Sequence, residues 1–270
     1  MIYYQGSEVR ALIIAIDIGN TNIHVGIFDR KKLVSSFLVG TDSNRSGDEY
    51  AAVLKSLITA EGYEVGALEG AIIGSVCPNV TPKIQLAVKK LTGITPSIVG
   101  PGIKTGYPIK IDNPSELGAD IVANTAGALD EANRASVIID FGTATTVCAL
   151  DKSKAFAGCY IMPGIQMSLD SLNGTGLLPS VIADEKFPVL AKNSADSMKS
   201  GVIFGQVMAI EGFVETYIKE LDLSPNVPVF VTGGFASLLL PYFRLQVKHV
   251  ENLTLKGLNV IYLANQKKIK

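Results

Sequence analysis

The chain contains one short phrase twice: LIIAIDIGNTNIHVG at residues 12–26 and SVIIDFGTATTVCAL at residues 136–150. Each copy is an apolar run that ends in an aspartate, followed by a hydrophobic residue, a glycine and a stretch with threonine. Such a run predicts a buried β-strand that ends in a tight turn. Glycine lets backbone N–H groups approach anionic oxygens, threonine hydroxyls donate hydrogen bonds, and a carboxylate holds a cation. The repeated phrase therefore predicts two turns that suit a metal-bound phosphate.

An ordinary hairpin turn is the alternative for either copy alone, because Asp-x-Gly-Asn is also a common turn sequence. The repetition of the preceding strand disfavours that interpretation. Asp17 and Asp140 are expected at the mouths of buried strands, where a carboxylate is costly unless a cation offsets its charge. We expect the two turns to face each other and to hold one nucleotide between them.

The two halves of the chain repeat a whole pattern of elements, not only these turns. Apolar periodicity and turn residues predict for the first half three strands, a helix, a strand, a helix and a strand, at residues 12–17, 24–29, 33–39, 48–60, 70–76, 81–91 and 95–99. The second half begins again with three strands and continues with helices and strands, at residues 137–140, 145–150, 155–161, 164–172, 194–220, 227–232, 234–243, 247–250 and 256–264. This pattern predicts a duplicated α/β fold.

The predicted division is an extension at residues 1–11, a first domain at 12–125 and a second domain at 126–270, with a ligand cleft between the domains. Residues 100–113 are rich in Gly and Pro and are expected to form a loop, whereas residues 114–133 are expected to form one helix. The longest predicted helix, at residues 194–220, suits either a core position or a subunit interface.

Composition and charge exclude several classes of protein. The net charge is −1 and no long basic run occurs, so we expect no nucleic-acid groove. No apolar run approaches the roughly 20 residues of a membrane span, and the first ten residues lack the apolar core of a signal peptide. The three cysteines are odd in number and show no CxxC spacing, which favours reduced thiols in a cytoplasmic protein.

Two further motifs each allow two interpretations from the residues alone, and a third suggests only a helix cap. The Thr232-Gly233-Gly234 sequence follows a buried strand and suits either close approach of a nucleotide or a tight turn. Asp120 falls about two turns into an otherwise apolar helix, so it is either a boundary charge that faces water or a catalytic group. Ser194 begins the long helix and suits a simple cap.

The order and spacing of ten segments resemble the type III pantothenate kinases, which belong to the actin-like, sugar-kinase-like and Hsp70-like ATPase superfamily. The resemblance covers residues 12–264, and the segments are AIDIGNTNIHVGIF, SGDEY, IIGSVCPNVTP, IVGPGIKTG, NPSELGAD, IDFGTATT, GCYIMPG, KNSADSMKSG, VTGG and LTLKGL. It implies a duplicated ribonuclease-H-like fold, two βββαβα domains that flank a cleft, and a cytoplasmic homodimer. It also implies a kinase that converts ATP and pantothenate to ADP and 4'-phosphopantothenate, the first step of coenzyme A biosynthesis.

The resemblance also implies roles for particular residues. Asp120 would be the general base, Asp17 would serve Mg²⁺, and Asp140 would serve a monovalent cation, K⁺ or NH₄⁺. The residues implied to contact ATP are Asp17, Ile18, Gly19, Asn20, Thr21, Asn22, Ile23, His24, Thr143, Gly233 and Gly234. The residues implied to border pantothenate are Ile111, Gly118, Ala119, Asp120, Ile121 and Ser194.

Three of these positions depart from the family pattern. Ile121 stands where the family usually has Arg, Ile111 where it often has Tyr, and Ser194 where it has Thr. The two isoleucines remove polar contacts from one pocket. They leave open two alternatives to pantothenate phosphorylation: a kinase for a more apolar alcohol, or a regulatory paralogue that keeps the nucleotide cleft.

Overall fold

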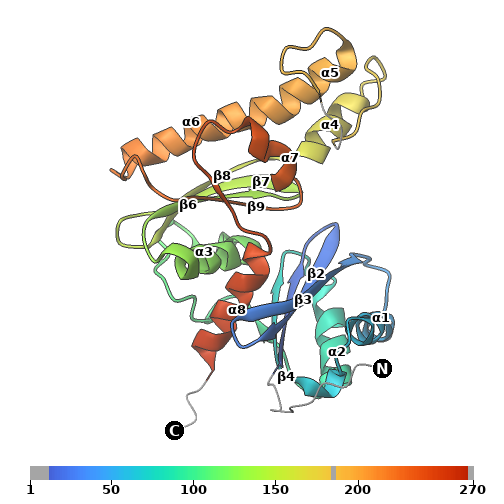
Figure 1. Cartoon of the computed structure of the whole chain (residues 1–270). Helices are drawn as coiled ribbons and strands as arrows, with labels where there is room; N and C mark the ends of the chain where they lie inside the picture. Colours follow the sequence, from blue (N-terminus) through green and yellow to red (C-terminus); the bar gives the residue numbers. More distant parts are fainter. Residues whose placement is uncertain (1–11, 184–186, 267–270) are drawn as a thin grey trace. The chain divides into compact units, whose positions relative to one another are not determined.

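The computed structural model describes residues 12–183 and 187–266 and contains two five-stranded sheets (Figure 1). The first sheet has the order β3-β2-β1-β4-β5. Its strands are β1 (Leu12–Ile18), β2 (Asn22–Asp29), β3 (Lys32–Gly40), β4 (Leu68–Ser75) and β5 (Ser97–Ile98). Strand β1 pairs antiparallel with β2 and parallel with β4, so the sheet is mixed.

The second sheet repeats this topology. Its strands are β6 (Ser136–Phe141), β7 (Ala144–Leu150), β8 (Phe156–Pro163), β9 (Val229–Thr232) and β10 (Lys248–His249). The order β10-β9-β6-β7-β8, read from β8, is the order of the first sheet. Equivalent backbone bonds also recur: the N–H of Val99 donates to the carbonyl of Ile73, and that of Val250 to the carbonyl of Val231, both at 2.9 Å. The predicted duplicated α/β fold is therefore confirmed.

Four longer helices accompany the first sheet: α1 (Gly47–Ala60), α2 (Thr81–Thr92), α3 (Ala119–Ala132) and α8 (Leu253–Asn265). Helix α1 begins with a capping box, in which Ser46 and Glu49 each accept the other's backbone N–H. Helix α2 has a proline in its first turn and ends at Gly93, which adopts φ 74°. These local signals explain why the helix boundaries predicted from sequence agree closely with the structure.

In the second unit of the chain, helices cover the sheet that β6 to β10 form. They are α4 (Ile165–Asn173), α5 (Ser194–Lys199), α6 (Gly205–Glu220) and α7 (Ala236–Leu239). A π-helical turn, Ser200–Phe204, joins α5 to α6 within the helix predicted as continuous. Val207, Ile210 and Val214 of α6 are at most 1% exposed and belong to the core that packs on this sheet. Figure 1 shows α6 running along one face of the sheet.

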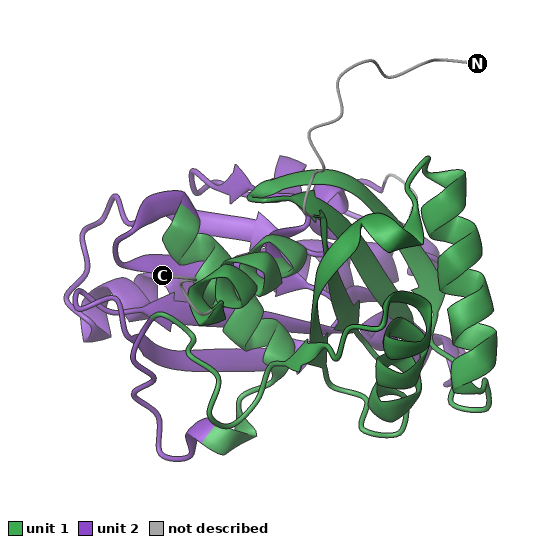
Figure 2. Cartoon of the chain, turned by 90° about the horizontal axis from the view of Figure 1, so that it is seen from below, with its two compact units in different colours: residues 1–106, 115–130, 254–270 green, residues 107–114, 131–253 purple. Residues whose placement is uncertain are grey.

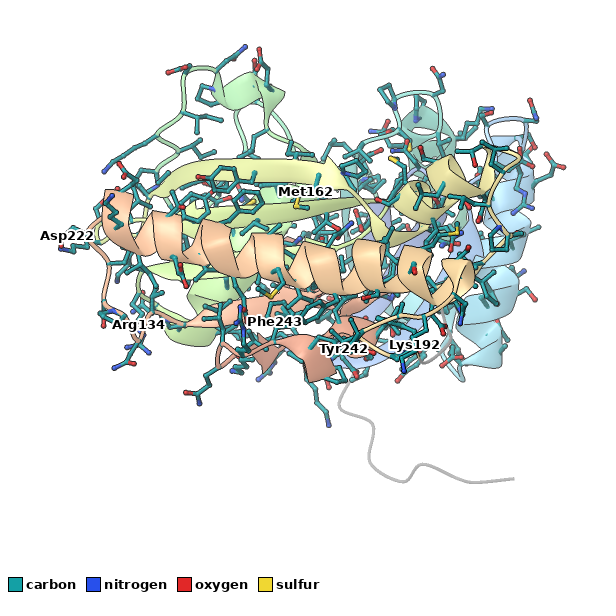
Figure 3. All side chains as sticks on the ribbon, turned by 90° about the horizontal axis from the view of Figure 1, so that it is seen from above. Arg134, Met162, Lys192, Asp222, Tyr242 and Phe243 are labelled. Carbon is teal, nitrogen blue, oxygen red and sulfur yellow. The ribbon has the colours of Figure 1, made fainter. Side chains whose placement is uncertain are left out.

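The region around α6 also holds a buried carboxylate. Glu211 is only 4% exposed, accepts the backbone N–H groups of Arg244 and Leu245, and forms an ion pair with the Arg244 guanidinium at 2.7 Å. Figure 3 looks down on α6 and labels Tyr242 and Phe243, which precede Arg244 in the chain. The ring of Tyr242 lies 6.3 Å from that of Phe204, centroid to centroid. The segment after α7 is thus attached to α6 by an ion pair and to the preceding π-helical turn by an aromatic contact.

The helical stretch Ser194–Glu220 is long and apolar enough to cross a membrane, judged by length and composition alone. Core helices of soluble proteins pass the same test, and 44% of the apolar window is buried here. The sequence had predicted no such run. Because one face of α6 lies in the core and carries the paired Glu211, we interpret the stretch as a helix that covers the sheet.

The compact units of the chain differ from the two predicted domains (Figure 2). Unit 1 comprises residues 1–106, 115–130 and 254–270, and unit 2 comprises residues 107–114 and 131–253. Helix α8, which was expected in the second domain, belongs to unit 1. It packs on α3 so closely that a side chain at Gly257 would overlap the carbonyl of Ala123, and Thr254 donates to Asn124 at 2.8 Å. The predicted extension at residues 1–11 lies outside the described residues.

The predicted helix at residues 114–133 is interrupted. Residues Pro114–Glu116 form a 3₁₀ turn, and α3 begins only at Ala119. A β-carbon at Gly118 would overlap an oxygen of the Asp120 carboxylate, so any other residue at this break would displace that side chain. This interruption sets the direction in which α3 starts, and with it the position of Asp120.

Candidate active site

The turn between β1 and β2 is held closed by its own backbone and by the end of β3. The N–H of Gly19 donates to the carbonyl of Asn22 at 3.0 Å. Thr41 binds the turn twice, through its hydroxyl to the carbonyl of Gly19 at 2.7 Å and through its N–H to the carbonyl of Thr21 at 3.0 Å. The side chains of Asn20, Thr21 and Asn22 are exposed, so the turn presents amides and a hydroxyl to solvent.

Asp17 lies at the carboxyl end of β1, one residue before the strand ends. It is in register with His24 on β2 and with Gly74 on β4. Directly opposite residues of an antiparallel pair share one face of a sheet, so Asp17 and His24 are on the same side. Burial lowers the pKa of His24 below its ordinary value of 6.5. His24 is therefore neutral at physiological pH and does not supply a counter-charge to Asp17.

The turn after β4 lies beside the first turn. The thiol of Cys77 donates to the side-chain oxygen of Asn20 at 3.2 Å, and the N–H of Cys77 donates to the hydroxyl of Ser75 at 3.0 Å. The Thr81 hydroxyl donates to the same Ser75 oxygen at 2.7 Å. Burial, and to a lesser degree the charge of Asp17, raises the pKa of the Cys77 thiol. Cys77 thus belongs to the surroundings of Asp17.

Sequence reasoning missed this contact and assigned Cys77 no position. The signal that could have found it is the parallel register of β1 and β4, which places the residues after Ser75 beside the residues after Ile18. The N–H of Val76 donates to the carbonyl of Ile18 at 3.1 Å, as that register requires. Strand pairing between residues so far apart in the chain is a tertiary property.

Asp120 lies in the first turn of α3, within the same unit. Its carboxylate accepts the N–H of Ile121 at 2.8 Å. Burial raises the pKa of Asp120 above its ordinary value of 3.8, although the backbone N–H groups of Ile121 and of Asp120 itself oppose the shift. A β-carbon built at Gly118 would lie 3.7 Å from the side chain of Val76, so the start of α3 abuts the end of β4. Unit 1 therefore places the start of α3 beside the end of β4, where the Asp17 turn also lies.

The second turn, between β6 and β7, has the same frame. Asp140 is in register with Thr146 on β7 and with Thr232 on β9. The N–H of Gly164, just after β8, donates to the carbonyl of Thr143 at 3.1 Å, which is the counterpart of the bond from Thr41 to Thr21. A side chain at Gly164 would overlap that carbonyl oxygen. The second turn is thus closed by glycine backbone where the first is closed by a threonine.

The two glycines after β9 differ in their surroundings. Gly233 adopts φ 97°, and a β-carbon there would lie 2.5 Å from both the Asp140 carboxylate and the backbone nitrogen of Phe141. Its lack of a side chain is therefore required by the turn itself. Gly234 is exposed, and a β-carbon there would meet nothing within 4 Å. Only Gly234 leaves open space at this point of unit 2.

Gln206 binds the two strands beside the second turn, and the sequence had not predicted this role. This side chain on α6 is 6% exposed. It accepts the Thr145 hydroxyl at 3.0 Å and donates to the carbonyl of Pro163 at 2.8 Å, so it joins β7 to the end of β8. A glutamine within an apolar helix was the available signal, because a buried amide needs partners.

The residues predicted to border the acceptor are divided between the units. Gly118, Ala119 and Ile121 are in unit 1, where Ile121 is only 7% exposed. Ile111 and Ser194 are in unit 2. Ser194 is exposed at the start of α5 and lines a cavity of about 570 Å³ together with Leu172, Leu178, Lys192, Asn193, Ser197 and Met198. Asn193 caps α5 by accepting the N–H of Asp196 at 2.9 Å.

The donor set of the two turns fits a hard cation that arrives with phosphate. Within residues 12–183 and 187–266, no group of three or more His, Cys, Asp or Glu side chains could hold a metal by itself. Mg²⁺ is usually bound by one or two carboxylates together with substrate phosphates and water. Asp17, with the exposed amides and hydroxyl of its turn, suits that mode of binding.

Comparison with known proteins identifies the class. A Campylobacter jejuni protein assigned to the Baf family of transcriptional activators has 16% identity and a TM-score of 0.57, over 93% of this chain and 98% of that one. A Sinorhizobium meliloti protein assigned as a 2-dehydro-3-deoxygalactonokinase has 12% identity and a TM-score of 0.56, over 96% and 98%. A Listeria monocytogenes protein assigned as an N-acetylmannosamine kinase has 12% identity and a TM-score of 0.54, over 95% and 100%. The fold is that of the actin-like ATPase and sugar kinase superfamily.

The family follows from the sequence itself. The sequence model of the type III pantothenate kinase family matches residues 13–216, and the chain belongs to that family. The resemblance drawn from the ten segments is thereby confirmed. Membership makes the protein an ATP-dependent kinase that uses Mg²⁺ and a small-molecule acceptor.

Proposed function

We propose that the protein transfers the γ-phosphoryl group of ATP to the primary hydroxyl of pantothenate, the first step of coenzyme A biosynthesis. The observation that carries the proposal is the position of Asp120. Its pKa is raised by burial, and the start of α3 that carries it lies beside the end of β4, as the Asp17 turn does. A general base close to a phosphate-binding turn is what phosphoryl transfer to an alcohol requires.

In the proposed mechanism, Asp17 and its turn bind Mg·ATP, and the backbone N–H groups and hydroxyls of the turn donate to phosphate oxygens. Mg²⁺ neutralises the charge of the phosphates when it is bound. Asp120 accepts the proton of the acceptor hydroxyl as its oxygen attacks. We assign a further ATP contact to Thr143, the adenosine side to Gly233 and Gly234, and a monovalent cation to Asp140.

We also propose that the protein is a cytoplasmic homodimer. The support is the outward face of α6 and the preceding π-turn, where Gly201, Gly205, Met208 and Gly212 are all exposed. These residues recur at the spacing of a single helix face. A side chain built at any of the three glycines would meet nothing within 4 Å, so another helix could approach closely.

A second candidate acceptor is a more apolar alcohol. Ile111 and Ile121 stand where the family has hydrogen-bonding side chains, and each hydrogen bond to a charged ligand is worth about 1.5–3 kcal/mol. A third candidate is a regulatory paralogue, and the name of the Campylobacter jejuni neighbour, a transcriptional activator, favours it. Both candidates keep the nucleotide-binding turns.

A coupled ADP-release assay with and without pantothenate separates these functions. We expect ADP release that depends on pantothenate, on Mg²⁺ and on a monovalent cation. Release with a smaller or more apolar alcohol alone would replace pantothenate as the acceptor. ATP binding by calorimetry without any release would contradict the kinase proposal and support the regulatory one.

A further inference from the structure

Residues 107–114 form a short piece of unit 2 that the chain inserts between two pieces of unit 1. Two backbone bonds attach it to the start of β8: the N–H of Phe156 donates to the carbonyl of Pro108 at 2.9 Å, and the N–H of Lys110 donates to the carbonyl of Phe156 at 2.8 Å. Ile109 and Phe156 form a parallel bridge. The segment is therefore an additional edge on the second sheet, but only one bridge long.

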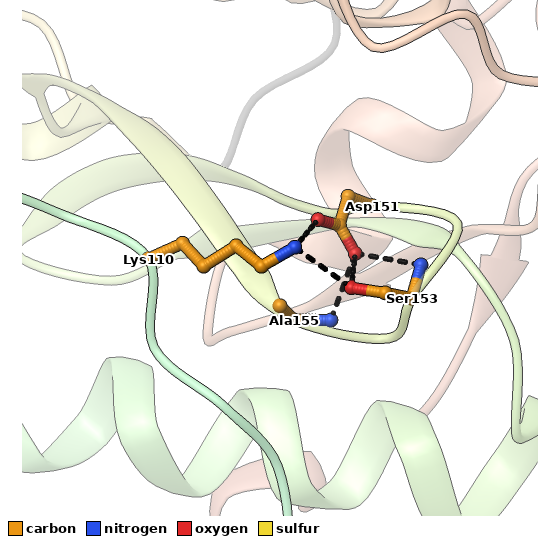
Figure 4. A network of polar contacts seen from close by, with 4 residues as sticks. All are labelled: Lys110, Asp151, Ser153 and Ala155. Carbon is orange, nitrogen blue, oxygen red and sulfur yellow. Dashed lines mark hydrogen bonds and ion pairs between the residues drawn. The ribbon is translucent and has the colours of Figure 1, made fainter.

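A side-chain contact fixes the same segment to the β7–β8 hairpin (Figure 4). The Lys110 ammonium donates to the Asp151 carboxylate at 2.8 Å and to the Ser153 hydroxyl at 2.9 Å. The other Asp151 oxygen accepts the N–H and the hydroxyl of Ser153, at 2.8 and 2.6 Å, and the N–H of Ala155 at 3.0 Å. The Asp151 carboxylate is thus held in position by hydrogen bonds from its own turn, independently of its bond to Lys110.

The charge of this anion persists across the physiological pH range. Burial acts to raise the pKa of Asp151, but Lys110 and the donors of the turn outweigh it and lower the pKa to about 2. The Asp151 side chain is 19% exposed, against 55% for Lys110. The pair is therefore better shielded on the acid side than an ordinary surface ion pair, most of which contribute little.

The contact between Lys110 and Asp151 lies next to a residue that is expected to line the acceptor pocket. Ile111 follows Lys110 directly, and Asp112 and Asn113 lead from there into the turn that begins α3. One bridge and two backbone bonds specify register only weakly. A slip of one residue would move Ile111 by about 3.3 Å along the sheet and reverse the side to which its side chain points.

We propose that Lys110 and Asp151 are positioning residues for the acceptor site. The pair fixes the register of residues 107–114 on β8 and so places Ile111, the residue expected to line the acceptor pocket. The inference rests on the proposed function for its acceptor, and on the structure alone for the attachment of the segment.

The test compares Lys110→Met and Asp151→Asn with Lys152→Met. Methionine keeps most of the length of lysine without its charge. Asparagine at residue 151 can still accept from Ser153 and Ala155. The control removes another ion pair from the same hairpin, between Lys152 and Asp222, which does not touch the segment. Two quantities are measured on the full chain: steady-state kinetics with pantothenate and ATP, and hydrogen exchange at the Lys110 amide.

We expect Lys110→Met and Asp151→Asn to raise KM for pantothenate about three- to tenfold and to leave KM for ATP within about twofold. Exchange at the Lys110 amide should accelerate by about tenfold, since its bond to Phe156 is no longer supported. Lys110→Arg should restore both values, and Lys152→Met should match the wild type.

Three results would overturn the inference. In the first, Lys110→Met matches the control Lys152→Met in both measurements. In the second, Lys110→Met raises the KM values for pantothenate and ATP equally, as a general loss of structure would. In the third, the wild-type protein shows no pantothenate-dependent ADP release, which would contradict both the proposed function and the role of Lys110 and Asp151 at the acceptor site. In that case the exchange measurement would still test whether the ion pair holds the segment on β8. Unchanged exchange of the residue-110 amide in Lys110→Met would contradict this, and faster exchange would support it.

Discussion

The β1–β2 turn of unit 1 and the β6–β7 turn of unit 2 share one frame but are closed by different means. In each, an aspartate is in register with one antiparallel and one parallel neighbour, and a backbone N–H just after the third strand donates to a threonine carbonyl. At the donor position unit 1 has Thr41, whose hydroxyl adds a bond, and unit 2 has Gly164, where no side chain fits. The same topology thus tolerates a side chain in one copy and excludes it in the other.

The neighbouring strand shows the same contrast. At the end of β4 unit 1 has Ser75, whose hydroxyl accepts two hydrogen bonds, while at the equivalent position unit 2 has Gly233 at φ 97°, just after β9. Unit 2 also has Gln206, a buried amide that joins β7 and β8. Unit 1 instead places a carboxyl with a raised pKa, Asp120, near its turn. The duplicated frame therefore carries a carboxyl group with a raised pKa in unit 1 and a tightly packed turn in unit 2.

The largest effect on turnover is expected in unit 1. Asp120→Asn should lower kcat about 10²- to 10⁴-fold, because it removes the proposed general base while preserving shape. Binding of ATP should stay near normal. Asp130→Asn, at the other end of α3 and paired with exposed Lys31, is the matched control and should retain turnover. Undiminished kcat in Asp120→Asn would show that the assignment of the base is wrong.

The next effect tests the steric difference between the turns. Gly164→Ala forces a methyl group onto the backbone of Thr143 and should destabilise the protein by about 1–3 kcal/mol or more. At the equivalent position of unit 1, Thr41→Ala loses one hydrogen bond and should cost only about 1 kcal/mol. Urea denaturation of both variants measures the contrast. Equal losses would mean that the two turns are closed alike.

The contribution of the buried amide is tested by Gln206→Leu. This change leaves the Thr145 hydroxyl and the Pro163 carbonyl without their partner and should cost about 1–3 kcal/mol of unfolding free energy. Glu215→Gln lies further along α6 and is exposed, so it should change stability by less than about 0.5 kcal/mol. A Gln206→Leu variant as stable as its control would contradict the supporting role.

The smallest effect concerns stability against pH. The pKa of Asp120 is raised above 3.8 in the folded state, so its contribution to stability is fully present at low pH and is lost as pH rises through the folded pKa. Asp120→Asn should therefore melt at a higher temperature than the wild type at pH 7, by a margin that shrinks toward pH 4. Thermal melts of Asp120→Asn and Asp130→Asn across this range test the sign. A margin that grows on acidification would contradict the raised pKa.

Much of the fold could be predicted because its signals are local. The paired Asp-Gly turns, the strand alternation, and Pro82 and Gly93 at the ends of α2 are written within a few residues each. The start of α3 and the Asp17 turn both lie beside the end of β4, and that Gly118–Asp120 and this turn form one site stays a prediction. The roles of individual residues in binding and catalysis remain predictions.

Sequence alone determined the duplicated α/β fold and the identity of the two aspartate turns, because short-range periodicity and turn chemistry suffice for these. It also determined the family, through the order and spacing of ten segments that resemble it. Only the tertiary structure decided that α8 joins unit 1, that Cys77 contacts Asn20, and that Lys110 reaches Asp151. Each of these depends on which distant strands and helices pack together. That pairing follows from burial and register across the whole chain, and no local pattern encodes it.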